Sequence, residues 1–222
     1  MSRNSKVKEQ AKIFLEGIKK SGDSVSWAMQ HAYVDMSRRT LHFTEQVNAK
    51  EREELSTEAK GKIEMELKTL ARKQKKKGAE FEQGDFDKWH KNLSKQLCNT
   101  YEGSTTMKKG LTYGQTQKWI NMTLKYLWTF ELVGDDLPDW LPSMTDLEPF
   151  MHIPLDRGML IRIEEKHQVK PPENGGSDNY TWSRIICYYD YIDYQNEVRK
   201  KLENESLAAY ELREWNSLNT EK

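Results

Sequence analysis

The stretch YGQTQKWINMTLKYLW, residues 113–128, decides how this chain is interpreted. Its apolar residues recur with a helical period, so we expect a helix over about residues 115–131. A turn-rich, basic segment precedes it, and Lys118 lies directly beside Trp119. The stretch is therefore either an amphipathic helix with a well-capped start or the second half of a hairpin that holds DNA. The second interpretation requires an acidic partner for Lys118 further along the chain.

Length and composition indicate a folded protein. The 222 residues suffice to bury a sizeable core, and we predict a single domain over residues 1–222. Hydrophobic residues make up 36% of the chain and charged residues 32%, which is polar for a globular protein. The 10% of aromatic residues nevertheless argues against intrinsic disorder.

The charge is distributed unevenly along a chain whose formal net charge is zero. Residues 1–125 contain 25 Lys and Arg against 16 Asp and Glu, whereas residues 126–222 contain 10 against 19. Such asymmetry hints at nucleic-acid contact, because phosphates respond to the local field rather than to the total charge. The alternative is that the two halves simply attract each other.

The remaining compositional signals exclude several classes of protein. Cys98 and Cys187 lack any motif spacing, so we expect reduced thiols in a cytoplasmic protein. No run approaches the roughly 18 apolar residues of a spanning helix, and we predict no membrane contact. The five histidines show no metal-binding spacing, and no glycine-rich phosphate loop occurs. We therefore expect neither a metal nor a cofactor.

The periodicity predicts a mainly α, multi-helix globular protein with few or no strands. We divide it into basic N-terminal helices (1–100), a hairpin and catalytic segment (101–166) and aromatic-rich C-terminal helices (167–222). Within the last part, residues 180–187 begin as a possible strand because of their β-branched and aromatic content. Asp85 is the expected N-cap of a helix beyond Gly84. The lysines of KQKKK, residues 73–77, either stabilise the negative end of a helix dipole or contact a DNA backbone.

An acidic residue with suitable surroundings does follow Lys118. Asp156 lies in HIPLDRGML, just after a proline, where a helix is expected to begin. A carboxylate at a helix start is held rigidly, which suits a charge that faces a developing cation. Cleavage of an N-glycosidic bond needs such an anion, and a deprotonated amine nearby can attack C1′ of the sugar.

The turn, the glycine, QKWINMTLKYL and the later Pro-x-Asp together resemble the helix-hairpin-helix DNA glycosylases. The resemblance covers about residues 105–165 and matches Lys118 to the family's lysine and Asp156 to its aspartate. It implies a divergent hairpin, similar to the archaeal 8-oxoguanine glycosylase branch. A bacterial phage-defence glycosylase that removes glucosylated hydroxymethylcytosine is another candidate relative. The chain differs in lacking a Leu-Pro-Gly-Val-Gly hairpin and in its longer lysine-to-aspartate spacing.

The resemblance and the residue types give three sets of candidate site residues. The expected catalytic pair is Lys118 and Asp156. The expected DNA contacts are Lys108, Lys109, Gly110, Thr112, Tyr113, Gly114, Gln115 and Lys125. The expected base pocket comprises Trp119, His152, Trp182, Tyr188 and Tyr191, because aromatic rings can stack on a flipped base. Each aromatic residue could equally belong to the core.

These observations predict a monomeric DNA glycosylase that flips a modified base out of double-stranded DNA and cleaves its N-glycosidic bond. Asp156 would stabilise the sugar cation. Lys118 would be a nucleophile only if its pKa were lowered, and otherwise would bind phosphate. Two alternatives remain open, a non-enzymatic nucleic-acid-binding module and a helical protein-interaction module.

Overall fold

The computed structural model describes residues 3–106, 110–173, 178–203 and 205–220, and this part of the chain contains nine α-helices and no strand. The prediction of a mainly α protein is confirmed. The α-helices are α1 (Arg3–Leu15), α2 (Ser24–Ser37), α3 (Ala49–Lys77), α4 (Gln83–Thr100), α5 (Tyr113–Val133), α6 (Met144–Leu147), α7 (Arg157–His167), α8 (Tyr188–Leu202) and α9 (Leu207–Thr220). Short 3₁₀ helices are η1 (Gly78–Glu80), η2 (Glu148–Phe150) and η3 (Trp182–Arg184).

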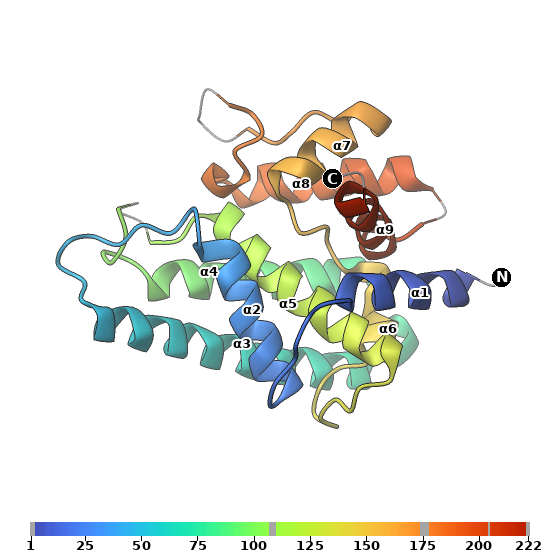
Figure 1. Cartoon of the computed structure of the whole chain (residues 1–222), viewed down its shortest axis with the longest axis horizontal. Coiled ribbons are helices and arrows are strands. Elements are labelled where there is room, and N and C mark those ends of the chain that lie inside the picture. The colour runs from blue at the N-terminus through green and yellow to red at the C-terminus, as the bar shows by residue number, and fades with distance from the viewer. Residues whose placement is uncertain (1–2, 107–109, 174–177, 204, 221–222) are drawn as a thin grey trace.

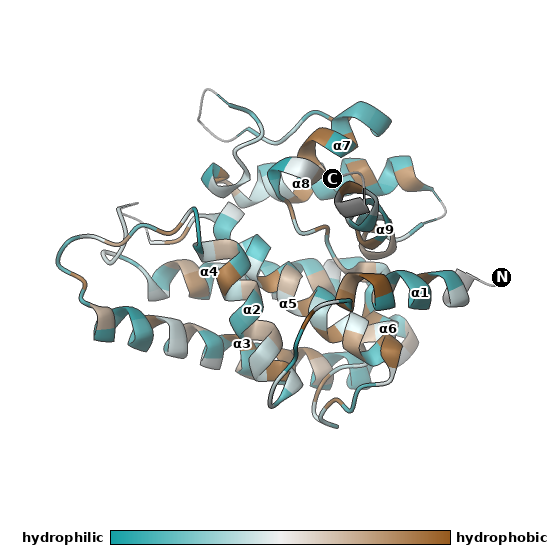
Figure 2. Ribbon diagram, viewed as in Figure 1, coloured by the Kyte–Doolittle hydropathy of each residue, from teal (hydrophilic) through white to brown (hydrophobic). Residues whose placement is uncertain are grey.

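Helix α5 is the centre of the molecule. It is buried at every position over residues 114–130 and contacts α1, α2, α4, α6 and α8 (Figure 1). Helix α3 is the opposite case, because most of its residues are hydrophilic (Figure 2). It buries only a narrow stripe that includes Ile63, Leu67 and Leu70. Helix α5 therefore lies inside the molecule with other helices around it, and α3 lies at the surface.

The core consists of two hydrophobic clusters. The larger joins α1 to α6 and includes the fully buried Trp119 and Trp128 of α5. The smaller joins α7, α8 and α9 with residues 153–155 and includes Tyr191 and Tyr210. Tyr113, at the start of α5, packs against the smaller cluster. The start of α5 therefore lies between the two clusters.

The beginning of α5 is fixed by reciprocal side-chain capping. The Thr112 hydroxyl accepts a hydrogen bond from the Gln115 amide at 3.1 Å, and the Thr112 amide donates to Gln115 Oε1 at 3.0 Å. This capping box satisfies two amides that the helix itself leaves unpaired. Gly134 ends α5 in the left-handed conformation, with φ of 89°. The capped start that the sequence suggested is thus present.

Helix α2 ends at Ser37. Residues beyond it form an isolated antiparallel bridge between Phe43 and Thr105. The Thr106 amide donates to the His42 carbonyl at 2.9 Å, which ties the two loops together. These loops therefore form one wall beside the start of α5.

The expected strand at residues 180–187 is absent; the segment contains η3 and extended residues instead. Its backbone pairs with the start of α5, because the Gly114 amide donates to the Ile185 carbonyl at 2.9 Å. A Cβ atom at Gly114 would lie 1.9 Å from the Trp182 carbonyl oxygen. The glycine is thus required for a close approach of two backbones.

The lysine cluster at the end of α3 has an internal partner. Lys73 and Lys77 lie 3.0 and 2.8 Å from the two carboxylate oxygens of Asp85. The sequence predicts Asp85 as the N-cap of α4, which is wrong. In the structure Glu82 is the N-cap, and Asp85 lies in the first turn of α4. The two ion pairs fasten α3 to α4. Among the described residues, no helix combines the length and hydropathy needed to cross a bilayer.

Candidate functional site

Lys118 and Asp156 form an ion pair. The Lys118 Nζ atom lies 2.9 Å from Asp156 Oδ2, although 38 residues separate them in the sequence. The Lys118 side chain is 8% exposed and that of Asp156 is 31% exposed, so the carboxylate is the partner that solvent reaches. Asp156 also caps α7 by accepting a hydrogen bond from the Met159 amide at 2.9 Å. The predicted catalytic residues are thus brought together.

The pair holds both groups in their charged forms. Burial raises the pKa of Asp156, but the charge and hydrogen bond of Lys118 outweigh it, and the net pKa is lowered. Burial likewise lowers the pKa of Lys118, and Asp156 outweighs it, so the net pKa is raised. At neutral pH, the site contains a fixed carboxylate backed by an ammonium group.

The carboxylate lines a surface hollow of about 450 Å³. This volume lies within the range of roughly 300–1,000 Å³ that small-molecule sites occupy. Helix α2 and the residues after it contribute Asp35, Arg38, Arg39 and Thr40 to the wall, together with Val34. The other lining residues are Lys118, Met122, Tyr126, Asp156, Arg157, Gly158, Trp182 and Trp215. Cationic side chains outnumber acidic ones, so the hollow favours an anionic ligand.

Two buried amide side chains position Asp156. Gln117 donates to the Leu155 carbonyl at 3.1 Å and accepts from the Leu155 amide at 3.0 Å. Gln195 likewise donates to the Ile153 carbonyl and accepts from the Ile153 amide, at 3.0 Å for each bond. The two glutamine side chains therefore bond the backbone of the extended segment before α7 in the way that neighbouring strands would. Its end presents Asp156 to Lys118, the residue that follows Gln117.

The expected DNA contacts around the hairpin are mostly internal. Lys108 and Lys109 lie outside the described residues. Gly110, Thr112, Gly114 and Gln115 are buried. A Cβ atom at Gly110 would lie 2.2 Å from the Cys98 carbonyl oxygen, so this glycine, like Gly114, serves close packing. The amides of Thr112, Gly114 and Gln115 already donate within the protein, which corrects their expected role as phosphate ligands.

The structure corrects the expectation for Lys125 as well. Its Nζ atom lies 3.0 and 2.7 Å from the two carboxylate oxygens of Glu211, and both side chains are at most 3% exposed. The ammonium group also lies over the rings of Phe14 and Trp215, at 4.1 and 4.9 Å. Lys125 is therefore enclosed by α1 and α9 and cannot reach DNA.

The expected base-pocket residues are divided by the structure. Trp182 lines the hollow beside Asp156. Trp119 is fully buried in the larger hydrophobic cluster and donates to the Met29 carbonyl at 3.0 Å. It belongs to the core because its neighbours on α2 and α5 cover it completely. Tyr113 is half-buried and packs edge-on against Tyr188.

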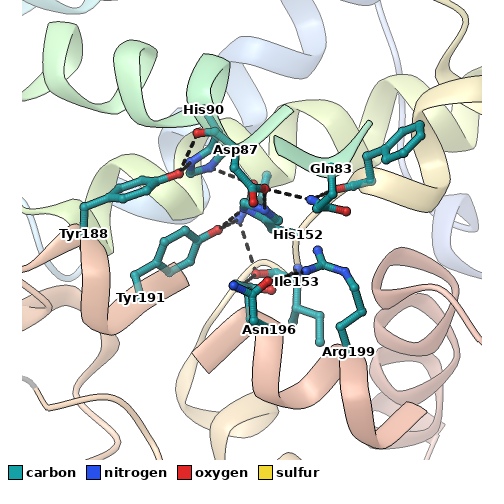
Figure 3. A network of polar contacts seen from close by, with 12 residues as sticks. Gln83, Asp87, His90, His152, Ile153, Tyr188, Tyr191, Asn196 and Arg199 are labelled. Carbon is teal, nitrogen blue, oxygen red and sulfur yellow. Dashed lines mark hydrogen bonds and ion pairs between the residues drawn. The ribbon is translucent and has the colours of Figure 1, made fainter. Parts of the chain in front are cut away.

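His152, Tyr188 and Tyr191 belong to a buried polar network and not to a pocket wall (Figure 3). Tyr191 contacts His152 Nδ1 at 2.9 Å, and His152 Nε2 contacts Asp87 at 2.9 Å. His90 is placed between Tyr188 and Asn121, at 3.1 Å from each. Burial lowers the pKa of both histidines, so both are neutral. The network joins α4, α5 and α8 behind the site.

Several residues of the site were missed from the sequence alone. Arg38, Arg39 and Arg157 line the hollow, and Gln117 and Gln195 position its carboxylate. The one available signal was the RR pair that follows the amphipathic stretch of α2. Buried glutamines carry no signal of their own, because only the fold shows which backbone groups they meet.

No group of three or more His, Cys, Asp or Glu that could hold a metal ion occurs among residues 3–106, 110–173, 178–203 and 205–220. The chain matches no protein-family model, and it has no match among curated proteins or solved structures.

Proposed function

We propose that this protein is a DNA glycosylase that binds a flipped nucleotide in the hollow beside Asp156 and cleaves its N-glycosidic bond. The observation that carries the proposal is the Lys118–Asp156 pair at 2.9 Å, on the wall of a cationic hollow of about 450 Å³. These are the two residues that the resemblance to helix-hairpin-helix glycosylases assigned to catalysis. Their approach across 38 residues supports the assignment.

The charges suit the reaction. As the bond to the base breaks, the sugar acquires positive charge, which a fixed carboxylate stabilises. Asp156 is anionic, rigidly capped and partly exposed to the hollow. A water molecule then adds its oxygen to C1′, and the leaving base takes up the proton that the water releases. Trp182 supplies an aromatic face in the same hollow on which a base could stack.

The raised pKa of Lys118 bears on the product. An ammonium group has no lone pair and cannot attack C1′. Lys118 instead keeps Asp156 ionised, and we expect a monofunctional enzyme whose product is an intact abasic site. Strand cleavage would then require alkali.

Base release is the direct test. The protein is incubated with three duplexes, which contain glucosylated hydroxymethylcytosine, 8-oxoguanine or no modification. Abasic sites are scored by strand cleavage with and without alkali. We expect alkali-dependent cleavage of one modified duplex and none with the Asp156→Asn protein. Binding to all three duplexes without base release would contradict the proposal and favour a non-enzymatic nucleic-acid-binding module.

A further inference from the structure

A second hollow adjoins the one beside Asp156. It has a volume of about 320 Å³ and shares Arg39 and Thr40 with its neighbour. Its remaining lining residues are Leu41, His42, Thr105, Thr106, Gln115, Thr181, Ser183 and Arg184. With Arg39 and Thr40 included, the described lining residues contain two arginines, four threonines and no acidic residue. Nothing in the proposed chemistry at Asp156 uses this hollow.

The walls of the second hollow are fastened together by hydrogen bonds. On one side, the Gln115 amide group donates to the Thr40 carbonyl at 2.8 Å, which joins α5 to the loop after α2. On the other side, the Thr112 hydroxyl donates to the Ser183 carbonyl at 2.6 Å, which joins α5 to η3. The Phe43–Thr105 bridge closes the third side. The hollow is therefore preorganised and needs no rearrangement to receive a ligand.

The chemistry of the lining favours a phosphate group. Arginine guanidinium groups and hydroxyls are common partners of phosphate oxygens in protein–DNA interfaces. Arg39 and Arg184 are exposed, and neither makes an ion pair within the part of the chain that the structure describes. Their charges are thus not neutralised by an acidic side chain among the described residues. Arg39 lies on the boundary, where it reaches both hollows.

We propose that this second hollow binds a backbone phosphate of a DNA strand whose neighbouring nucleotide occupies the hollow beside Asp156. The inference rests on the proposed function for the position of that nucleotide, but phosphate binding itself needs no catalysis. In this proposal the side chains of Arg39 and Arg184 contact the DNA, and the buried backbone amides of the predicted hairpin do not. It also implies a polynucleotide ligand and not a free nucleoside.

The test measures DNA affinity as a function of salt. Fluorescence anisotropy with an unmodified duplex, which is not turned over, is recorded for the wild type, Arg39→Ala, Arg184→Ala and the double variant. Each lost phosphate contact should reduce the slope of log Kd against log [NaCl] by about 0.9. Each should also weaken binding about tenfold, as expected for a hydrogen bond to a charged group. Arg39→Lys should retain the slope because it retains the charge.

Arg72→Ala is the matched control, because Arg72 is an exposed arginine that lines a larger hollow of about 920 Å³ near α6. It should leave both affinity and slope unchanged. Equal effects of all three arginines would overturn the site. Inorganic phosphate is compared with NaCl at equal ionic strength. Phosphate should displace DNA from the wild type more strongly than NaCl does, and this excess should vanish in the double variant; an excess that persists there would also overturn the proposal.

Base release is measured in parallel, so that the two proposals fail separately. Altered salt slopes without any base release would leave the phosphate site standing and remove the glycosylase. Base release with unaltered slopes in both arginine variants would do the reverse.

Discussion

Asp156 combines two roles, one on each oxygen of its carboxylate. Its Oδ1 atom caps α7 through the Met159 amide, and its Oδ2 atom pairs with Lys118. The cap fixes the carboxylate in space, and the ion pair fixes its charge. Lys118 is the more deeply buried partner, so its main effect is on Asp156 and not on a ligand.

This relation predicts a shift in the pH dependence of activity. Lys118 holds the pKa of Asp156 below its usual value of 3.8, against the opposing effect of burial. In Lys118→Met the effect of burial is opposed only by the Met159 amide and the charge of Lys125, so the pKa should rise and the carboxylate should become protonated at higher pH. We expect the acid limb of the base-release rate to move upward by about one pH unit or more, since burial alone shifts carboxyl pKa values by that much. Single-turnover rates between pH 4 and 8 measure it.

The exposed Lys88→Met serves as the control for removing a positive charge. An acid limb that stays in place in Lys118→Met would show that Lys118 does not set the charge of Asp156.

Lys125 and Glu211 give a second prediction at the scale of residues. Burial lowers the pKa of Lys125 and raises that of Glu211, so each charge depends on the other. Lys125→Met leaves Glu211 buried and unpaired, which should lower the free energy of unfolding by about 3–5 kcal/mol. The double variant Lys125→Met/Glu211→Leu should recover most of this loss. Urea unfolding at pH 7 measures both, and a double variant no more stable than Lys125→Met would contradict the explanation.

At the scale of elements, the close contact between α5 and η3 sets the position of Trp182. Gly114→Ala would place a methyl carbon within 1.9 Å of a backbone oxygen, which no side-chain rotation relieves. We expect a loss of about 1–3 kcal/mol in the free energy of unfolding, as for overpacking, and slower base release. Gly61→Ala in α3 is the matched control, because no atom outside its own helix lies within 4 Å.

Gly61→Ala should stabilise the protein by about 0.5–1 kcal/mol, since alanine has the higher helix propensity. Thermal and urea unfolding of the two variants provide the comparison. Equal changes at the two glycines would show that the contact with η3 is not close.

The helices that the sequence predicted best are those with local signals. The start of α7 was predicted from a proline followed by Asp156, and Asp156 is its N-cap. The lysines of residues 73–77, which the sequence suggested could lie at the end of a helix dipole, do lie at the end of α3. The supposed strand at 180–187 is absent although its composition is β-branched and aromatic, because the chain turns through η3 there and its Ile185 carbonyl accepts from the start of α5 rather than from a strand. Local sequence patterns thus predicted the helices better than they predicted which segments contact each other.

The candidate site shows the same division. Lys118 and Asp156 could be predicted because a family pattern names both residues. The partner of Lys125 could not, because Glu211 lies 86 residues away and only the packing of α9 brings it near. The basic lining of the two hollows comes from loops after α2 and before α8, whose approach to α5 has no local signature.

At the scale of the whole molecule, the buried network behind the site makes stability depend on pH. His90 and His152 are neutral in the folded protein because burial lowers their pKa values, whereas unfolding restores values near 6.5. The unfolded chain therefore binds more protons below this pH, and stability falls as the pH decreases. His90, whose pKa lies well below 6.5, should contribute about 1.4 kcal/mol per pH unit below about 6.5, and His152 should contribute less because Asp87 opposes the effect of burial on its pKa.

We expect the free energy of unfolding to fall by roughly 1–3 kcal/mol between pH 7.5 and 5.5 from these two histidines. Urea unfolding at both pH values measures it. His152→Gln should show a smaller pH dependence, and the exposed His31→Gln should show the same pH dependence as the wild type. Equal stability of the wild type at the two pH values would contradict neutral, buried histidines.

The uneven charge of the chain is also explained at this scale. Part of the basic charge of the first half is used inside the fold, where Lys73 and Lys77 pair with Asp85 and Lys125 pairs with Glu211. Around the two hollows, Arg38, Arg39 and Arg184 make no ion pair with a described residue, whereas Arg157 pairs with Asp178. We infer that DNA contacts this face, and not the lysine-rich end of α3.

The most direct test of the central claim is the single-turnover rate of base release for Asp156→Asn against a matched control. Asparagine caps helices as well as aspartate does, so this change removes the charge and keeps α7. Asp23→Asn makes the same change at the N-cap of α2, where Asp23 accepts from the Ser26 amide at 2.7 Å. We predict a loss of about 10²–10³-fold or more for Asp156→Asn and an unchanged rate for Asp23→Asn. Equal rates for the wild type and Asp156→Asn would contradict a catalytic carboxylate at this site.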